Sequence, residues 1–192
     1  MWARVESGSV TEVYTSPKAL TIGNVQYPRN IFQLWSEAEL KAIGIYIVEI
    51  DNTNLKDKEY YYNTNQTFNF ASNKVTASYG SATAKKLADY SETVGGITTN
   101  FTGLKTIHKN NINSQAAAIL TKHDWMSIRE AEGGTDMPSN IKTWRGNVRA
   151  MANTMCTKID GVSDVDALAA LYVYNSDDPP VRPLGEFPAE PS

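Results

Sequence analysis

The spacing of hydrophobic and polar residues changes near residue 80. Before this point, short runs alternate with the period of two that is typical of β-strands. The run ARVESGSVTEVY (3–14) predicts two strands about Ser7-Gly8, and EYYYNTNQTFNFASNKVTASY (59–79) predicts three strands separated by Asn-rich turns. Residues 1–80 are therefore expected to form a small antiparallel β-rich module.

One short helix is expected inside this module. In NIFQLWSEAELKAIGIYIVEI (30–50), Ser36 can cap a helical turn that ends near Gly44. The apolar run at 45–50 follows directly and predicts a further strand.

After residue 80 the apolar residues recur in steps of three and four, which is the spacing of a helix. We expect residues 81–122 to be a helical connector, with 112–120 its best helix-forming part. A heptad-spaced stripe in this connector predicts the seam of a coiled coil or of an amphipathic helix, and hence a route to a homo-oligomer, with a trimer favoured. A broken linker is the alternative, because Gly95-Gly96 costs about 2 kcal/mol of helix propensity. The stripe comprises Leu87, Tyr90, Val94, Ile97, Phe101 and Leu104.

Residues 123–175 have the pattern of a helical hairpin with a short helix after it. Thr121 and Asp124 have the spacing of a capping box, Gly133-Gly134 ends the first helix, and Pro138 suits the first turn of the second. We expect the two helices to pack across the turn at 133–138. The residues predicted to form this core or an interface are Trp125, Ile128, Trp144, Val148 and Met151.

The C-terminal part ends the predicted fold. A last short helix is expected after Ser163, with Asp166 completing a capping box and Leu168 and Leu171 buried. Residues 176–192 contain five of the eight prolines in the chain, which predicts an extended tail that lies on a surface or hangs free. The expected fold class is α+β, with the β-rich module, the helical segment, the hairpin and the tail in that order.

Composition and charge narrow the function classes. The net charge of −3 and the isoelectric point near 5.4 give no electrostatic footprint for nucleic acid. No run approaches the roughly 18 apolar residues of a membrane span, and the first residues have no apolar core of a secretory signal. A single cysteine, Cys156, excludes an internal disulfide and a multi-cysteine metal site. We expect a soluble protein made in the cytoplasm.

The candidate chemical residues favour a protein without catalytic activity. His123-Asp124 could be a base and its orienting acid, but no serine or cysteine nucleophile stands in a recognisable motif. His108 has no second histidine at metal-binding spacing. Glu130 and Glu132 are two apart on a predicted helix and would face apart, unlike a glycosidase pair. We expect no cofactor, no metal and no enzymatic activity.

The C-terminal half resembles a known family. The segment DWMSIREAEGGTDMPSNIKTWRGNVRAM (124–151), followed by IDGVSDVDALAALYVYN and RPLGEFP, resembles the C-terminal module of tailed-bacteriophage tail-fibre and tail-fibre-assembly proteins. The stretches MWARVESGSVTEVY and YYYNTNQTFNF similarly resemble the opening domain of small phage tail proteins. The matching positions of the C-terminal pattern are Asp124, Trp125, Arg129, Glu132, Pro138, Trp144, Arg145, Val148 and Arg149.

This resemblance implies a function through contact. It points to a non-enzymatic structural component of a phage tail, at the fibre base, baseplate or tail tip, whose partners are other tail or fibre proteins. It also fits a tail-fibre assembly chaperone, which is the alternative. The implied location is the tail of the virion, after synthesis in the host cytoplasm. The family carries no catalytic residues to transfer to this sequence.

Overall fold

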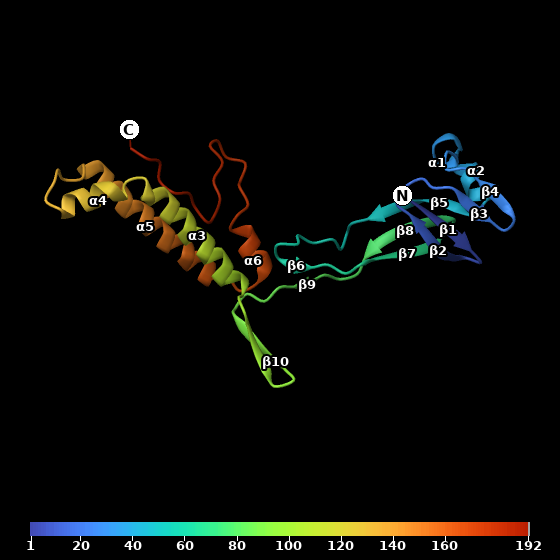
Figure 1. Cartoon of the computed structure of the whole chain (residues 1–192), viewed down its shortest axis with the longest axis horizontal. Helices are drawn as coiled ribbons and strands as arrows, with labels where there is room; N and C mark the ends of the chain where they lie inside the picture. Colours follow the sequence, from blue (N-terminus) through green and yellow to red (C-terminus); the bar gives the residue numbers. More distant parts are fainter. Residues whose placement is uncertain (192) are drawn as a thin grey trace. The chain divides into compact units, whose positions relative to one another are not determined.

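A computed structural model describes residues 1–191 and confirms the α+β class. The chain divides into two compact units, Met1–Thr83 and Ala84–Ser192 (Figure 1). This division lies three residues after the boundary expected between residues 80 and 81. The predicted subdivisions at 122 and 175 do not separate further compact units, because helices and tail from 84 onward pack into one.

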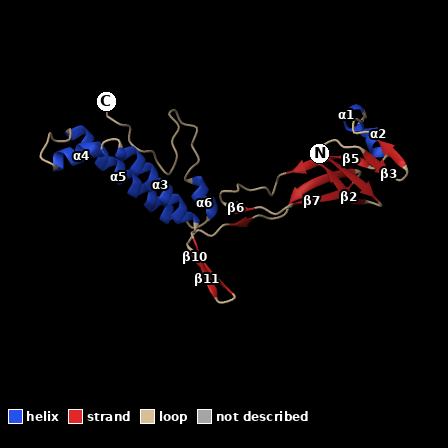
Figure 2. Ribbon diagram, viewed as in Figure 1, coloured by secondary structure: helices blue, strands red, loops and turns tan. Residues whose placement is uncertain are grey.

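The first unit is built on a five-stranded sheet in the order β2-β1-β5-β8-β7 (Figure 2). Its neighbours pair antiparallel except β5 and β8, which run parallel, so the expectation of a purely antiparallel module was wrong at this pair. The long connection at 52–65 brings the chain back to the end of the sheet where β5 finishes, so β7 runs antiparallel to β5. Because β8 turns back from β7 and lies between the two, it runs parallel to β5. The strands are β1 (Trp2–Glu6), β2 (Ser9–Tyr14), β5 (Ile45–Asp51), β7 (Gln66–Ala71) and β8 (Lys74–Tyr79).

Two tight turns set the register of this sheet. Ser7 and Gly8 between β1 and β2 have φ of 50° and 78°, and Ser72 and Asn73 between β7 and β8 have φ of 50° and 60°. Two successive positive φ angles are the signature of the type I′ hairpin turn, whose twist matches that of the strands. The strands predicted about Ser7-Gly8 and in 59–79 are confirmed. The shorter strands of this unit are β3 (Leu20–Ile22), β4 (Val25–Tyr27) and β6 (Tyr61–Tyr62), and β9 (Thr83–Ala84) pairs with β6.

Two short helices follow β4. Helix α1 (Ile31–Leu34) buries Ile31, and α2 (Glu37–Ala42) begins at a capping box in which Ser36 and Glu39 satisfy each other's backbone N–H groups. The helix predicted after Ser36 is confirmed. Two apolar clusters stabilise the unit, and they lie on opposite faces of the sheet. The first contains Tyr14, Leu20, Ile31, Phe32, Leu40 and Ile45, and the second contains Ala3, Val48, Val75 and Ala77.

The second unit begins with a hairpin where a helical seam was expected. Strands β10 (Tyr90–Val94) and β11 (Ile97–Phe101) pair antiparallel about Gly95-Gly96, whose φ angles are 60° and 82°. These are again the angles of a type I′ turn. The seam of Leu87, Tyr90, Val94, Ile97, Phe101 and Leu104 is therefore wrong as a helix, and a coiled-coil trimer has no helical seam here.

Two long helices form the body of the second unit. Helix α3 (Leu104–Thr121) and α5 (Ser139–Asp160) lie side by side and antiparallel (Figure 1). Lys109 near the start of α3 forms an ion pair with Asp160 at the end of α5, with an N···O distance of 2.7 Å. The shared core includes Ile112 and Ala116 from α3. The residues of α5 that are buried are Ile141, Trp144, Arg145, Val148, Ala152, Met155 and Ile159.

Helix α4 (Asp124–Ala131) links these two helices and buries none of its residues. The expected packing of this helix on α5 was therefore wrong: Trp125 and Ile128 are exposed, whereas Trp144 and Val148 are buried and Met151 is half-buried. The α5 stripe packs on α3 instead, because α3 offers 18 residues to cover and α4 only eight. The capping box at Thr121 was also wrong, since Thr121 still belongs to α3 and donates to the Ala117 carbonyl.

The last helix and the tail complete the unit. Helix α6 (Val165–Ala170) is capped by Asp164, which accepts from the Ala167 N–H, one residue after the Ser163 cap that was expected. Leu168 is buried as predicted, and Leu171 is only half-buried. The tail is extended on a surface: Leu184 is fully buried and its N–H donates to the Leu171 carbonyl at 2.9 Å.

Candidate interaction surface

The exposed side of α4 is the most distinctive surface of the second unit. Trp125 is 53% exposed and Ile128 is 58% exposed, and they lie one helical turn apart. The Arg129 guanidinium lies 5.0 Å from the centre of the Trp125 ring, in cation–π contact. We call Trp125, Ile128 and Arg129 the α4 face.

Arg129 also fixes the loop that follows α4. Its Nε donates to the Thr135 carbonyl at 2.9 Å and its Nη2 to the Asp136 carbonyl at 3.3 Å. Gly134 packs against it so closely that an added Cβ would come within 2.8 Å of the Arg129 Cγ. These contacts hold Arg129 against its own loop, so that the Trp125 ring is supported on one side.

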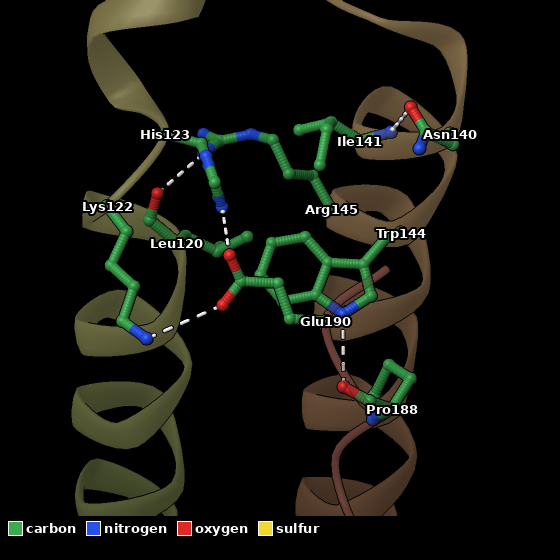
Figure 3. A network of polar contacts seen from close by, with 9 residues as sticks. All are labelled: Leu120, Lys122, His123, Asn140, Ile141, Trp144, Arg145, Pro188 and Glu190. Carbon is green, nitrogen blue, oxygen red and sulfur yellow. Dashed lines mark hydrogen bonds and ion pairs between the residues drawn. The ribbon is translucent and has the colours of Figure 1, made fainter. Parts of the chain in front are cut away.

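A buried arginine anchors the start of α4. Arg145 on α5 is only 5% exposed, and its Nη1 donates to the Leu120 carbonyl at 2.5 Å (Figure 3). Its Nη2 forms an ion pair with Asp124 at 2.7 Å. The guanidinium therefore joins the last turn of α3 to the first turn of α4, where an acidic residue also favours the helix dipole.

The C-terminal tail is held against the same corner. The Trp144 indole N–H donates to the Pro188 carbonyl at 3.0 Å, and Glu190 binds His123 at 2.7 Å and Lys122 at 3.4 Å (Figure 3). The His123 ring lies edge-on to Trp144 at 5.5 Å. We call these contacts the tail latch. The hydrogen bond from His123, followed by the nearby Lys122, lowers the pKa of Glu190 below its ordinary 4.5.

The residues considered for catalysis have structural partners. His123 is bonded to Glu190 rather than poised beside a nucleophile, and Asp124 is engaged by Arg145. His108 is buried, and its Nδ1 lies 2.8 Å from the Tyr172 hydroxyl. The Cys156 thiol is half-buried, and burial raises its pKa. Within residues 1–191 no three His, Cys, Asp or Glu side chains gather as a metal site would require. No helix among these residues is long and apolar enough to cross a bilayer.

Two features of this surface were not predicted. The sequence places Arg145 four residues after Ile141 and three before Val148, which is the spacing of the buried stripe and could have indicated its burial. The tail latch had no such signal, because His123 and Glu190 are 67 residues apart. Comparison with protein-family models, with curated proteins and with solved structures gives no match to this chain.

Proposed function

We propose that this chain is a non-enzymatic structural component of a bacteriophage tail, located at the fibre base, the baseplate or the tail tip. In this proposal it is made in the host cytoplasm, enters the virion as a homo-oligomer, and binds other tail or fibre proteins through its surface. The resemblance in 124–151 supplies the phage context, and the α4 face supplies the contact.

One observation carries the contact part of the proposal. Helix α4 buries none of its own residues, yet it exposes a tryptophan and an isoleucine side by side, next to the half-buried Arg129. Tryptophan and arginine dominate the binding energy of protein interfaces when they sit at the centre of a contact. A helix that has no fully buried residue and presents such side chains is best explained by a partner that covers them.

The residues of the phage-like pattern support the same surface. Asp124 and Arg145 anchor α4, Arg129 supports Trp125, and Trp144 holds the tail. Four of the nine pattern residues thus form or anchor the α4 face. This is the arrangement expected when a pattern preserves a binding surface rather than a catalytic cleft.

The test is incorporation into particles. A phage that encodes this chain would be complemented with tagged wild-type protein or with a Trp125→Ser, Ile128→Ser variant, and purified particles would be assayed for the tag. Because both side chains are exposed, the variant should fold normally, and we expect its content in particles to fall at least about tenfold.

A matched control is available in the first unit. Leu34 is 74% exposed, so Leu34→Ser removes an even more exposed apolar side chain away from α4. It should be incorporated like the wild type. Equal incorporation of the α4 variant would contradict the proposed role of this face.

A second candidate function is a tail-fibre assembly chaperone, which one observation favours. An apolar cavity of about 570 Å³ lies between the end of α6 and the tail, lined by exposed Val173 and Val181 together with Tyr174. Such a cavity could accept a client segment. This candidate predicts that Val173→Asp releases fibre chains that co-purify from infected cells, while the chain itself is missing from finished particles.

A further inference from the structure

The β10–β11 hairpin projects from the second unit without a covering element. It extends away from α3 and α5 (Figure 1). Every residue of β11 is exposed. Val94 and Ile97, on either side of the turn, are 77% and 73% exposed. A two-stranded ribbon is marginally stable in water when nothing packs on it. The exposure of these apolar residues therefore raises the question of what covers them.

The hairpin has two chemically different faces. The register pairs Tyr90 with Phe101 and Val94 with Ile97, so these four apolar side chains lie on one face, with the Glu92–Thr99 pair between them. The Tyr90 and Phe101 rings stack there at 4.9 Å. The opposite face is polar and consists of Ser91, Thr93, Thr98 and Asn100.

The outer edge of β11 carries none of the usual protection against pairing. Natural edge strands are guarded by charges, prolines or bulges. The sequence ITTNF (97–101) has no charge and no proline, and its register with β10 is continuous. β10 differs, because it contains Glu92, which faces Lys86 at 3.7 Å. The open edge of β11 is thus the one suited to receive another strand.

The turn determines which backbone groups point outward from β11. In a type I′ turn the Val94 carbonyl accepts from the Ile97 N–H, which makes these residues a hydrogen-bonded pair. Hydrogen-bonded and non-hydrogen-bonded pairs alternate along an antiparallel ladder. Ile97, Thr99 and Phe101 therefore direct their backbone groups to β10. Thr98 and Asn100 direct theirs outward.

We propose that β11 pairs antiparallel with β11 of a second copy of this chain, about a twofold axis at Thr99. In this register Thr98 of one copy lies opposite Asn100 of the other, and the outward backbone groups of both satisfy each other. Ile97 lies opposite Phe101 on the apolar face, in non-hydrogen-bonded pairs that bring side chains closest.

The composition of the strand is what selects a second copy as the occupant. The four-stranded sheet that results has two unbroken apolar rows, each running Tyr90, Phe101, Ile97, Val94 across the two copies. Thr99 meets Thr99 at the centre, and no like charges meet across the β11 edges. A twofold contact of this kind is self-complementary, as closed dimers require. This pairing specifies the homo-oligomer of the proposed function, but it is tested on the purified chain without any other tail protein.

The experiment is sedimentation equilibrium on the full chain and on two proline variants. Asn100→Pro removes an outward N–H from β11 in each copy, and proline is tolerated at such edge positions. Ser91 is the cross-strand partner of Asn100, and its backbone N–H points away from β11. Ser91→Pro is therefore the matched control. We expect the wild type and Ser91→Pro to be dimers. The Kd of Asn100→Pro should rise at least about tenfold, because two hydrogen bonds are lost per dimer.

Other outcomes would overturn the pairing. A wild type that stays monomeric at high micromolar concentration, a trimer, or an Asn100→Pro variant that dimerises like the wild type would each do so, as would equal dissociation of the two variants. Ile97→Lys provides a second test that does not alter the backbone. This substitution places a charge opposite Phe101 of the partner copy, so it should likewise weaken the dimer. Because these measurements contain no phage component, their failure would leave the proposed tail role standing.

Discussion

At the scale of single residues, Arg145 is the side chain on which the α4 corner depends. Its buried guanidinium satisfies the Leu120 carbonyl and pairs with Asp124. Arg145→Met keeps most of the volume but removes the charged donor to the Leu120 carbonyl and the ion-pair partner of Asp124, although the His123 N–H still donates to that carbonyl. We expect a loss of about 1–3 kcal/mol in the free energy of unfolding, measured by chemical denaturation of the second unit's transition.

Arg149→Met is the matched control for this substitution. Arg149 is exposed and lies one turn further along the same helix. Its replacement should change the free energy of unfolding by no more than about 0.5 kcal/mol. Equal effects of the two substitutions would mean that the Arg145 contacts contribute nothing beyond helix propensity.

The tail latch is expected to depend on pH through Glu190. The hydrogen bond from His123 lowers the pKa of this carboxyl in the folded protein. A lowered folded pKa contributes stability above the unfolded pKa, and that stability is lost as the pH falls through the folded value. Acidification below the ordinary value of 4.5 should therefore loosen the tail.

The indole N–H resonance of Trp144 would report this change, because that group donates to the Pro188 carbonyl. In the wild type this resonance should shift as the pH falls below about 4.5, which is the ordinary pKa of a glutamate in the unfolded chain. In Glu190→Gln the shift in this range should disappear. An identical pH profile in the two proteins would rule out Glu190 as the group responsible.

Single residues were predictable where local spacing decides their environment. Trp144 and Val148 belong to a stripe that is buried as expected. Trp125 fits a helical stripe equally well, yet it is exposed, because burial depends on whether another element covers the helix. Spacing along one helix identifies a face but not the partner of that face.

At the scale of elements, the turn at Gly95-Gly96 decides the conformation of 87–104. Gly96 has φ of 82°, and an added Cβ would meet nothing within 4 Å, so Gly96→Ala tests the backbone angle alone. A left-handed conformation costs an alanine about 1–2 kcal/mol. Amide exchange in β10 and β11 should accelerate by about tenfold.

Gly146→Ala is the corresponding control in a helix. Gly146 lies in α5, is exposed, and also has open space at its Cβ. Alanine should stabilise α5 by about 0.5–1 kcal/mol. If Gly96→Ala left exchange in the hairpin unchanged, the turn would not require positive φ at this residue.

The hairpin was mistaken for a helix for a geometric reason. Residues four apart on one strand share a face, and a two-residue turn places residues three apart opposite each other on that face. The apolar positions 90, 94, 97 and 101 therefore step by four, three and four in a hairpin, as they would in a heptad. The strands about Ser7-Gly8 and the helix after Ser36 were predictable because their turn and cap residues specify one conformation.

At the scale of the whole molecule, the two compact units should unfold separately. Leu40 lies in a core cluster of the first unit, and Trp144 in the core of the second. Leu40→Ala should destabilise the first unit by about 2–5 kcal/mol, and Trp144→Ala the second by about 3–5 kcal/mol. Differential scanning calorimetry should show each substitution lowering one transition and leaving the other in place. A single transition lowered by both would contradict independent units.

The fold class and the change of pattern near residue 80 were available from the sequence because they depend on local periodicity. The parallel pairing of β5 and β8, the tail latch and the exposed α4 face depend on contacts between distant residues. Such contacts depend on which apolar faces remain uncovered after the individual helices and strands have formed, and local spacing does not specify this.

The central claim is that this chain acts as a structural part of a phage tail through protein contact. The most direct test is quantitative mass spectrometry of purified particles from a phage that encodes it, normalised to the major tail protein. We predict a constant copy number in every preparation. Absence from particles, with the chain recovered on fibre proteins from infected cells, would contradict the claim and identify an assembly factor instead.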